Sequence, residues 1–171
     1  MKKVKPIRVA VIGGGYWGRN LVRNYAELGA LAGVCDTNAQ TLEALKNQYP
    51  AGVYTTSYQE LLEDKAIQGI VIAAPAAMHY TLAREALLSC KDVYVEKPLA
   101  LDVAEACELR DIAADKKSIL MVGHLLQYHP AFIKLKEMIK DGELGRIHYI
   151  YSNRLNFGKI RREEDILWSF A

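Results

Sequence analysis

The tripeptide Glu96-Lys97-Pro98 places two opposite charges and a proline directly after an apolar run, residues 93–95. Such a run is typical of a buried strand, so Lys97 follows the strand's carboxyl end. Partial burial and a nearby positive charge would lower the pKa of the Lys97 amine, which makes proton exchange feasible near neutral pH. Pro98 would stiffen the turn and fix where Lys97 points. A salt-bridged strand end fits the spacing equally well, and the tripeptide alone leaves both interpretations open.

Three glycines near the amino end, Gly13, Gly15 and Gly18, match the spacing G-x-G-x-x-G. They lie between an apolar run, residues 7–13, and a helical pattern from about residue 16 to 28. In such a unit the first glycine permits a tight turn, the second lets a pyrophosphate approach the backbone, and the third allows close helix–strand packing. The start of the helix then offers N–H groups and a positive dipole end to the phosphates.

Asp36 ends the second apolar run, about 20 residues after the glycines, as expected of a dinucleotide site. A carboxylate there accepts hydrogen bonds from the adenosine ribose and repels a 2′-phosphate. The two residues that follow, Thr37 and Asn38, offer no arginine to a 2′-phosphate. We therefore predict NAD in preference to NADP. A glycine turn followed by a capping aspartate is the weaker alternative, because the whole unit is present.

Several other residues fall at the same predicted edge of the sheet. Trp17 could pack on the cofactor or against a second domain, and His79 could face the ligand or cap a helix; both choices stay open. Besides the glycines and Asp36, we predict that the following residues line the cofactor site: Tyr16, Trp17, Ala74, Pro75, His79, Glu96 and Lys97.

The elements that must position these residues alternate along the chain. Helical patterns separate the apolar runs, and Ser57 with Glu60 and Asp102 with Glu105 form helix-capping signatures. Strands that are apolar on both faces indicate a parallel sheet covered by helices on both sides. We predict an α/β fold, a Rossmann-type doubly wound parallel sheet, with strands at residues 7–13, 31–36, 69–75, 92–98 and 118–124.

The pattern changes after residue 124. A helix is predicted for residues 130–142, and the alternating stretch at 146–158 resembles an antiparallel strand. We therefore place a dinucleotide-binding domain at residues 1–124 and the beginning of an incomplete second α+β domain at 125–171.

Composition excludes several classes of protein. The net charge of +2 and the absence of a dominant basic stretch argue against a nucleic-acid partner. No apolar run approaches the roughly 18 residues of a membrane span, and no signal peptide is recognised. The scattered Cys35, Cys90 and Cys107 are typical of reduced thiols in a cytoplasmic protein. The histidines lack metal-ligand spacing, so no metal is predicted.

Taken together, the stretches "GGGYWG", Asp36, "AAPAAMHY", "EKPLA" and "VGHLLQYHPAF" resemble the glucose–fructose oxidoreductase/inositol dehydrogenase family over essentially the whole chain. This resemblance implies an NAD-dependent sugar dehydrogenase in which Lys97 is the catalytic, substrate-contacting residue. It also implies a cis Lys97–Pro98 bond and cofactor contacts from Gln127, where many members carry arginine, and from Trp168.

Residues 123–171 resemble the branch that oxidises the 3-hydroxyl of UDP-N-acetylglucosamine-type sugars, notably UDP-N-acetylglucosaminuronic acid. Cationic and polar groups in this stretch suit a diphosphate or a carboxylate, although a charged strand face is the alternative. The predicted substrate contacts, besides Lys97, are Arg154, Asn156, Lys159 and Arg161.

Family members continue well beyond residue 171, where the resemblance places the catalytic histidine and the rest of the substrate domain. The chain is therefore expected to be truncated or to retain only cofactor binding, and a homo-oligomer is expected to form through the second domain. The alternatives are a non-catalytic NAD-binding module and a dehydrogenase of another sugar or polyol, such as inositol.

Overall fold

The computed structural model describes residues 7–153 of the chain. The chain divides into two compact units, Met1–Val122 and Gly123–Ala171. The predicted cofactor residues with numbers below 100 all belong to the first unit.

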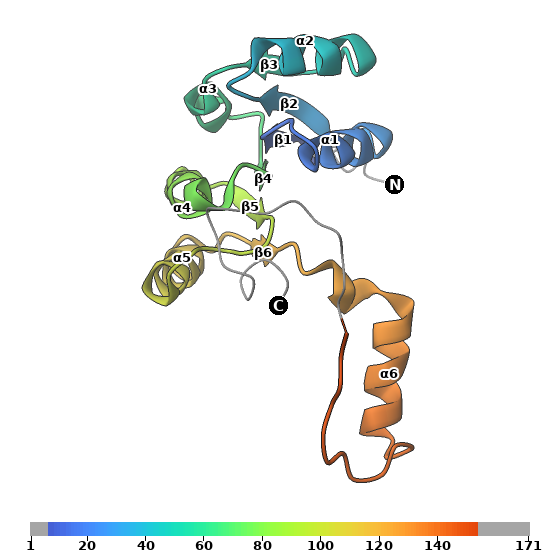
Figure 1. Ribbon diagram of the computed structural model, residues 1–171. Helices are drawn as coiled ribbons and strands as arrows, with labels where there is room; N and C mark the ends of the chain where they lie inside the picture. Colours follow the sequence, from blue (N-terminus) through green and yellow to red (C-terminus); the bar gives the residue numbers. More distant parts are fainter. Residues whose placement is uncertain (1–6, 154–171) are drawn as a thin grey trace, which may run out of the picture. The chain divides into compact units, whose positions relative to one another are not determined.

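The first unit is built on a six-stranded sheet in the order β3-β2-β1-β4-β5-β6 (Figure 1). Every neighbouring pair of strands is parallel. From β1 the chain first extends the sheet in one direction, and from β4 it extends it in the other. The predicted doubly wound parallel sheet is therefore confirmed. The strands are β1 (Val9–Ile12), β2 (Leu31–Cys35), β3 (Val53–Thr55), β4 (Gly69–Ile72), β5 (Asp92–Val95) and β6 (Leu120–Val122).

Helices cover both faces of this sheet. Buried residues of α3, α4 and α5 pack against one face, and buried residues of α1 and α2 pack against the other. Figure 1 shows α3, α4 and α5 following one another along the same side. The helices are α1 (Gly18–Glu27), α2 (Ala39–Gln48), α3 (Tyr58–Glu63), the short 3₁₀ helix η1 (Ala76–Met78), α4 (His79–Leu88) and α5 (Val103–Lys116).

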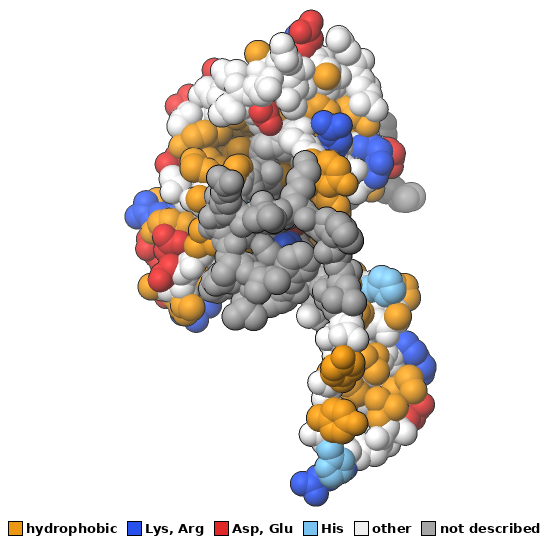
Figure 2. Space-filling view, in the orientation of Figure 1, with side chains coloured by type: hydrophobic (Ala, Val, Ile, Leu, Met, Phe, Trp, Pro, Cys, Tyr) orange, Lys and Arg blue, Asp and Glu red, His pale blue; other side chains and the backbone are white. Residues whose placement is uncertain are grey.

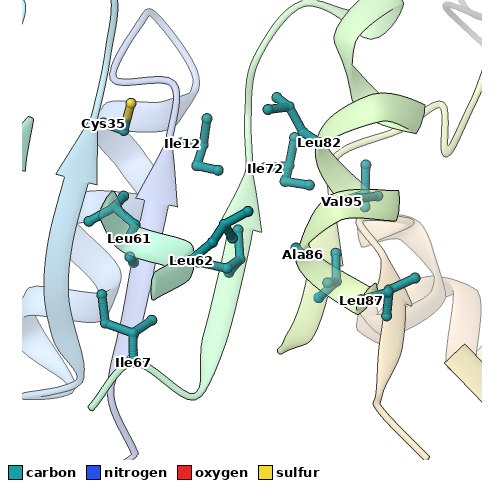
Figure 3. Packing of buried hydrophobic residues seen from close by; sticks show 14 of the residues in the cluster. Ile12, Cys35, Leu61, Leu62, Ile67, Ile72, Leu82, Ala86, Leu87 and Val95 are labelled. Atoms are coloured by element: carbon teal, nitrogen blue, oxygen red, sulfur yellow. The ribbon is translucent and has the colours of Figure 1, made fainter. Parts of the chain in front are cut away.

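Alternation along the central strands produces these two hydrophobic layers. In β1, Ala10 and Ile12 join the layer beneath α3 and α4, while Val9 and Val11 join the layer beneath α1 and α2. All four are buried, as expected for a parallel strand covered on both sides. Figure 3 shows strand residues such as Ile72 and Val95 facing helix residues of the first layer. Burying each such side chain stabilises the fold by about 1.5–3 kcal/mol.

The structure differs from the sequence predictions at several places in this unit, and β4 and β5 each end three residues earlier than predicted. The strand β3 was missed, because its three residues are too few to show a pattern and Val53 is exposed. The first helix begins at Gly18, two residues later than predicted. The predicted capping box at Ser57 is wrong: the Ser57 hydroxyl donates to Oε1 of Gln59, 3.0 Å away, and accepts no backbone N–H of α3.

The second unit contains the 3₁₀ helix η2 (Leu125–Tyr128) and the helix α6 (Pro130–Lys140). Pro130 is the first residue of α6, and Gly142 follows its end with φ +76°, as predicted. The strand predicted from residue 146 is absent from the part that the structure describes, because residues 146–153 pair with no other strand there. Hydrophobic side chains of α6, including Phe132, Leu135 and Ile139, are more than 40% exposed. Figure 2 shows such side chains gathered over α6 and the segment after it.

Two general features follow from the described residues. Among residues 7–153, no helix combines the length and the apolar character that crossing a membrane requires. The thiols of Cys35, Cys90 and Cys107 are all free.

Candidate functional site

Four of the predicted site segments follow strands that end in register. Ile12 at the end of β1 pairs with Cys35 of β2 and with Ile72 of β4, and Ile72 pairs with Val95 of β5. The glycine loop, Asp36, residues 73–75 and Glu96 therefore leave the sheet at one carboxyl edge. The chain reverses its winding direction between β1 and β4, and ligands of open α/β sheets bind at such a switch point.

The glycines of the loop meet very different surroundings. Gly13 has φ +95°, and a Cβ on it would lie 2.7 Å from the carbonyl group of Ala73. A Cβ on Gly18 would lie 1.8 Å from the carbonyl oxygen of Gly13, so only glycine lets α1 start this close to the loop. A Cβ on Gly15 would meet no described atom within 4 Å. The first and third glycines thus serve packing, and the second borders open space.

The start of α1 is suited to an anion. Its N-cap residue, Trp17, makes no side-chain capping hydrogen bond, and the first turn carries no acidic residue. The start of the helix is its positive dipole end, where the N–H groups of Arg19 and Asn20 donate to the carbonyl oxygens of Gly15 and Trp17, 3.1 and 2.9 Å away. This positive end follows the open space at Gly15, which fits the phosphates of a dinucleotide.

Asp36 is tied directly to the glycine loop. Its Oδ2 accepts a hydrogen bond from the backbone N–H of Gly14, 2.7 Å away, and its Oδ1 accepts one from the N–H of Asn38, 2.8 Å away. The sequence analysis missed Gly14, which lies outside the three-glycine motif. A Cβ on Gly14 would be 2.7 Å from Cδ1 of Leu45. The run of three consecutive glycines, Gly13–Gly15, was the available signal.

The turn at residues 96–98 is held by contacts with its neighbours. The Trp17 indole N–H donates to Oε1 of Glu96, 2.7 Å away, and the Tyr94 hydroxyl donates to the same oxygen, 3.0 Å away. Glu96 is only 9% exposed, and its backbone N–H donates to the carbonyl of Ile72 at 2.9 Å. The Lys97–Pro98 bond is cis, as predicted. Tyr94 was not predicted, although its place two residues before Glu96 puts both side chains on one face of the strand.

His79, the first residue of α4, is 2% exposed. Its Nδ1 lies 2.6 Å from the carbonyl oxygen of Pro98, and its Nε2 lies 2.9 Å from that of Ala74. Both ring nitrogens thus face backbone acceptors, and the ring accepts no helix N–H as a cap would. The imidazole joins the loop after β4 to the turn after β5.

The remaining predicted residues of this edge differ in exposure. Tyr16 is 86% exposed and Trp17 is 42% exposed. Pro75 is also exposed, whereas Ala74 and Lys97 are half-buried. A ligand at this edge could therefore contact the loop side chains without displacing the core.

Cys35, which directly precedes Asp36, is buried. Burial, with smaller contributions from Asp36 and Glu60, raises the pKa of the Cys35 thiol to about 11, so this thiol stays neutral at pH 7. Within residues 7–153, no group of three or more His, Cys, Asp or Glu side chains could hold a metal ion.

Some predicted residues are not brought into this arrangement. Gln127 belongs to the second unit, where it is exposed and accepts a hydrogen bond from Nζ of Lys136. Arg154, Asn156, Lys159, Arg161 and Trp168 lie outside the described residues.

Known proteins resemble this chain in fold and in sequence. The chain is 29% identical over 149 residues to the UDP-N-acetylglucosamine 3-dehydrogenase of Acidithiobacillus ferrooxidans, covering 87% of this chain and 45% of that enzyme. The crystal structure of myo-inositol 2-dehydrogenase from Lactobacillus plantarum matches with a TM-score of 0.78 and 28% identity, over 84% of this chain and 43% of that one. The crystal structure of GenD2 from gentamicin A biosynthesis, in complex with NAD, matches with a TM-score of 0.76 and 30% identity, over 82% and 40%.

The chain thus spans less than half the length of the relatives it matches. The sequence profile described as "Oxidoreductase family, NAD-binding Rossmann fold" matches residues 7–124, which include the glycine loop, Asp36 and residues 96–98. The predicted cofactor, NAD, is that of the matched family. The chain belongs to this family, which also carries the names of glucose–fructose oxidoreductase and inositol dehydrogenase.

Proposed function

We propose that this chain is the cofactor-binding part of an NAD-dependent dehydrogenase that oxidises a hydroxyl group of a sugar. The observation that carries the proposal is that Lys97 and the glycine loop leave the sheet at the same edge, on strands that end in register. The proposed cofactor contacts in the first unit are Gly13, Gly15, Tyr16, Trp17, Gly18, Asp36, Ala74, Pro75, His79, Glu96 and Lys97.

Each part of the edge has a task in this proposal. Gly15 and the uncapped start of α1 receive the pyrophosphate, and Asp36 receives the adenosine ribose. Asp36 already accepts two backbone N–H groups, and each carboxylate oxygen has a second lone pair for a ribose hydroxyl. Lys97 contacts the substrate hydroxyl and exchanges its proton. Bound NAD would supply the hydride acceptor.

We propose a nucleotide sugar of the UDP-N-acetylglucosamine type as the substrate, with contacts from Lys97, Arg154, Asn156, Lys159 and Arg161. The named activity of the Acidithiobacillus relative supports this choice. A polyol such as inositol is the second candidate, supported by the likeness to myo-inositol 2-dehydrogenase. In the proposal Gln127 and Trp168 complete the cofactor contacts.

Calorimetric titration tests the cofactor assignment. We expect tighter binding of NAD than of NADP, since the Asp36 carboxylate would face the 2′-phosphate at a cost of a few kcal/mol. Asp36→Ala should narrow the preference, and Asp115→Ala, which removes an exposed carboxylate of α5, should leave it unchanged. Tighter binding of NADP by the unaltered chain would refute the assignment.

A second titration separates the two substrates. The NADH-loaded chain is expected to bind UDP-N-acetylglucosaminuronic acid more tightly than myo-inositol. The double change Arg154→Ala and Arg161→Ala should weaken binding of the nucleotide sugar and leave that of inositol as it was. The reverse order of affinities would favour the polyol.

We further propose that copies of the chain associate through the second unit. Its exposed Phe132, Ile133, Leu135 and Ile139 would lose contact with water in an interface. Sedimentation velocity should show a mass that rises with concentration, and a monomer at every concentration would contradict self-association.

A further inference from the structure

The two residues that flank Lys97 are both anchored by side chains from other elements. Glu96 receives the indole N–H of Trp17, from the start of α1, at 2.7 Å. The carbonyl oxygen of Pro98 faces Nδ1 of His79, from the start of α4, at 2.6 Å. These contacts join segments that are 79 and 19 residues apart in the sequence.

The surroundings make both anchors strong. Glu96 is 9% exposed and His79 is 2% exposed, so little water competes for these groups. The carboxylate also accepts the Tyr94 hydroxyl, which leaves it few alternative orientations. On the other side, Nε2 of His79 lies 2.9 Å from the carbonyl oxygen of Ala74. A neutral imidazole donates one N–H, and the shorter contact, 2.6 Å from Nδ1 to the Pro98 carbonyl oxygen, assigns that N–H to Nδ1.

We infer that Trp17 and His79 are positioning residues for Lys97: each holds one neighbour of the lysine, and together they set where its amine lies at the cofactor edge. This inference rests on the proposed function, and it goes beyond any contact that either side chain makes with the cofactor. Trp17 directly precedes Gly18, so its hydrogen bond also links the phosphate loop to the lysine turn.

Lysine reactivity in the 171-residue chain provides the test. Trace acetylation with acetic anhydride, read by mass spectrometry, gives the rate at Lys97 relative to that at the exposed Lys116. Saturating NAD should slow acetylation of Lys97 in the unaltered chain, because the nicotinamide would cover its amine. Each variant is compared at NAD concentrations that saturate it by its own measured Kd.

Trp17→Phe should reduce the protection of Lys97 by about two- to tenfold, the equivalent of one lost hydrogen bond. Glu96→Met removes the acceptor of the same bond, and the effects of the two changes should be less than additive if Trp17 acts through Glu96. Tyr58→Phe is the matched control: it removes an aromatic donor, 2.9 Å from the Glu85 carboxylate, at a residue outside the glycine loop and residues 96–98. It should leave the protection of Lys97 unchanged.

For His79, two replacements separate its two nitrogens. His79→Asn places an amide near the position of Nδ1 and should keep the anchor on Pro98, so the protection of Lys97 should be retained. His79→Gln reaches toward the position of Nε2 and should keep only the contact with Ala74, so protection should fall. A structural role alone predicts equal effects from both changes.

The outcomes separate the inference from the proposed function. If the unaltered chain fails to bind NAD, or NAD leaves Lys97 as reactive as before, the proposed function fails and the inference fails with it. If NAD protects Lys97 equally in the unaltered chain, Trp17→Phe and His79→Gln, with folding verified by calorimetry, the inference alone is overturned.

Discussion

At the scale of single residues, Gly15 and Gly18 belong to one motif, but only Gly18 is required by the packing of the fold. An added Cβ on Gly18 collides with the loop itself, whereas one on Gly15 points into open space. We predict that Gly18→Ala lowers the free energy of unfolding by about 2–4 kcal/mol. Gly15→Ala should change it by less than about 0.5 kcal/mol.

Although Gly15→Ala should hardly change stability, it should weaken the binding of NAD. Its new methyl group would occupy the approach of the pyrophosphate, so the Kd of Gly15→Ala should rise about 5- to 150-fold, as a steric cost of 1–3 kcal/mol implies. Scanning calorimetry and titration calorimetry together check both statements. A Gly15→Ala variant that is stable and binds NAD normally would contradict the role given to this glycine.

The Cys35 thiol gives a prediction for alkaline pH. Its pKa rises from 9.0 in the unfolded chain to about 11 in the fold, mainly because of burial. The unfolded chain therefore ionises first, and the thiol's contribution to stability, complete below pH 9, is lost as pH rises to 11. At about 1.4 kcal/mol for each unit, the loss amounts to about 2–3 kcal/mol.

Cys35→Ala should show a smaller decrease between pH 9 and pH 11 than the unaltered chain. Urea unfolding under reducing conditions at several pH values measures this difference. Parallel pH profiles for the two proteins would show that the thiol does not ionise differently in the two states.

At the scale of elements, two helix starts that look alike in the sequence differ in the fold. The Asp102 carboxylate accepts the N–H groups of Ala104 and Glu105 at the start of α5, whereas Ser57 caps nothing. We predict that Asp102→Ala lowers the free energy of unfolding by about 1 kcal/mol, while Ser57→Ala lowers it by clearly less. Denaturant titration followed by circular dichroism measures both. Equal losses would contradict the capping assignment.

Sequence patterns predicted some elements of the fold and missed others. The apolar runs of β1, β4 and β5 and the capped helix α5 were predictable, because each follows local rules. The strand β3 has only three residues, and its pairing depends on β2 rather than on its own pattern. The stretch at 146–153 alternates like a strand but finds no partner strand among the described residues, and pairing decides whether a strand forms.

The site was predictable to the same extent. The glycine motif, Asp36 and residues 96–98 were recognisable because their spacing is local. The bond from Asp36 to Gly14 and the bond from Trp17 to Glu96 join distant segments, so only the folded chain reveals them. The two interpretations of His79, ligand contact or helix cap, omitted the one that the structure displays, a bridge between two loops.

At the scale of the whole molecule, we expect the first unit to fold and to bind NAD without the second unit. The segments proposed to bind the pyrophosphate and the adenosine ribose all belong to the first unit. We therefore predict that a fragment of residues 1–124 folds and binds NAD with a Kd within about tenfold of that of the full chain, as expected when one hydrogen bond is lost. Loss of all measurable binding would move the main contacts to the second unit.

Catalysis, unlike NAD binding, should require more than the 171 residues of this chain. The chain covers 45% of the dehydrogenase from Acidithiobacillus, and one acid–base partner typically contributes about 100-fold or more to a rate. We expect negligible NADH formation from UDP-N-acetylglucosaminuronic acid by the 171-residue chain. Rapid formation, followed by absorbance, would require Lys97 to work with a histidine of this chain. In a chain extended to the length of its relatives, Lys97→Met should abolish turnover and leave NAD affinity nearly intact.

The place of Trp17 has an optical consequence. It is one of only two tryptophans in the chain, and its indole lies between the glycine loop and Glu96. Tryptophan emission overlaps the absorption band of reduced nicotinamide, whereas the oxidised ring does not absorb there. In a Trp168→Phe background, excitation energy would therefore pass from Trp17 to bound NADH and not to bound NAD. The chain would then carry, at its own phosphate loop, a fluorescent reporter of the redox state of its ligand.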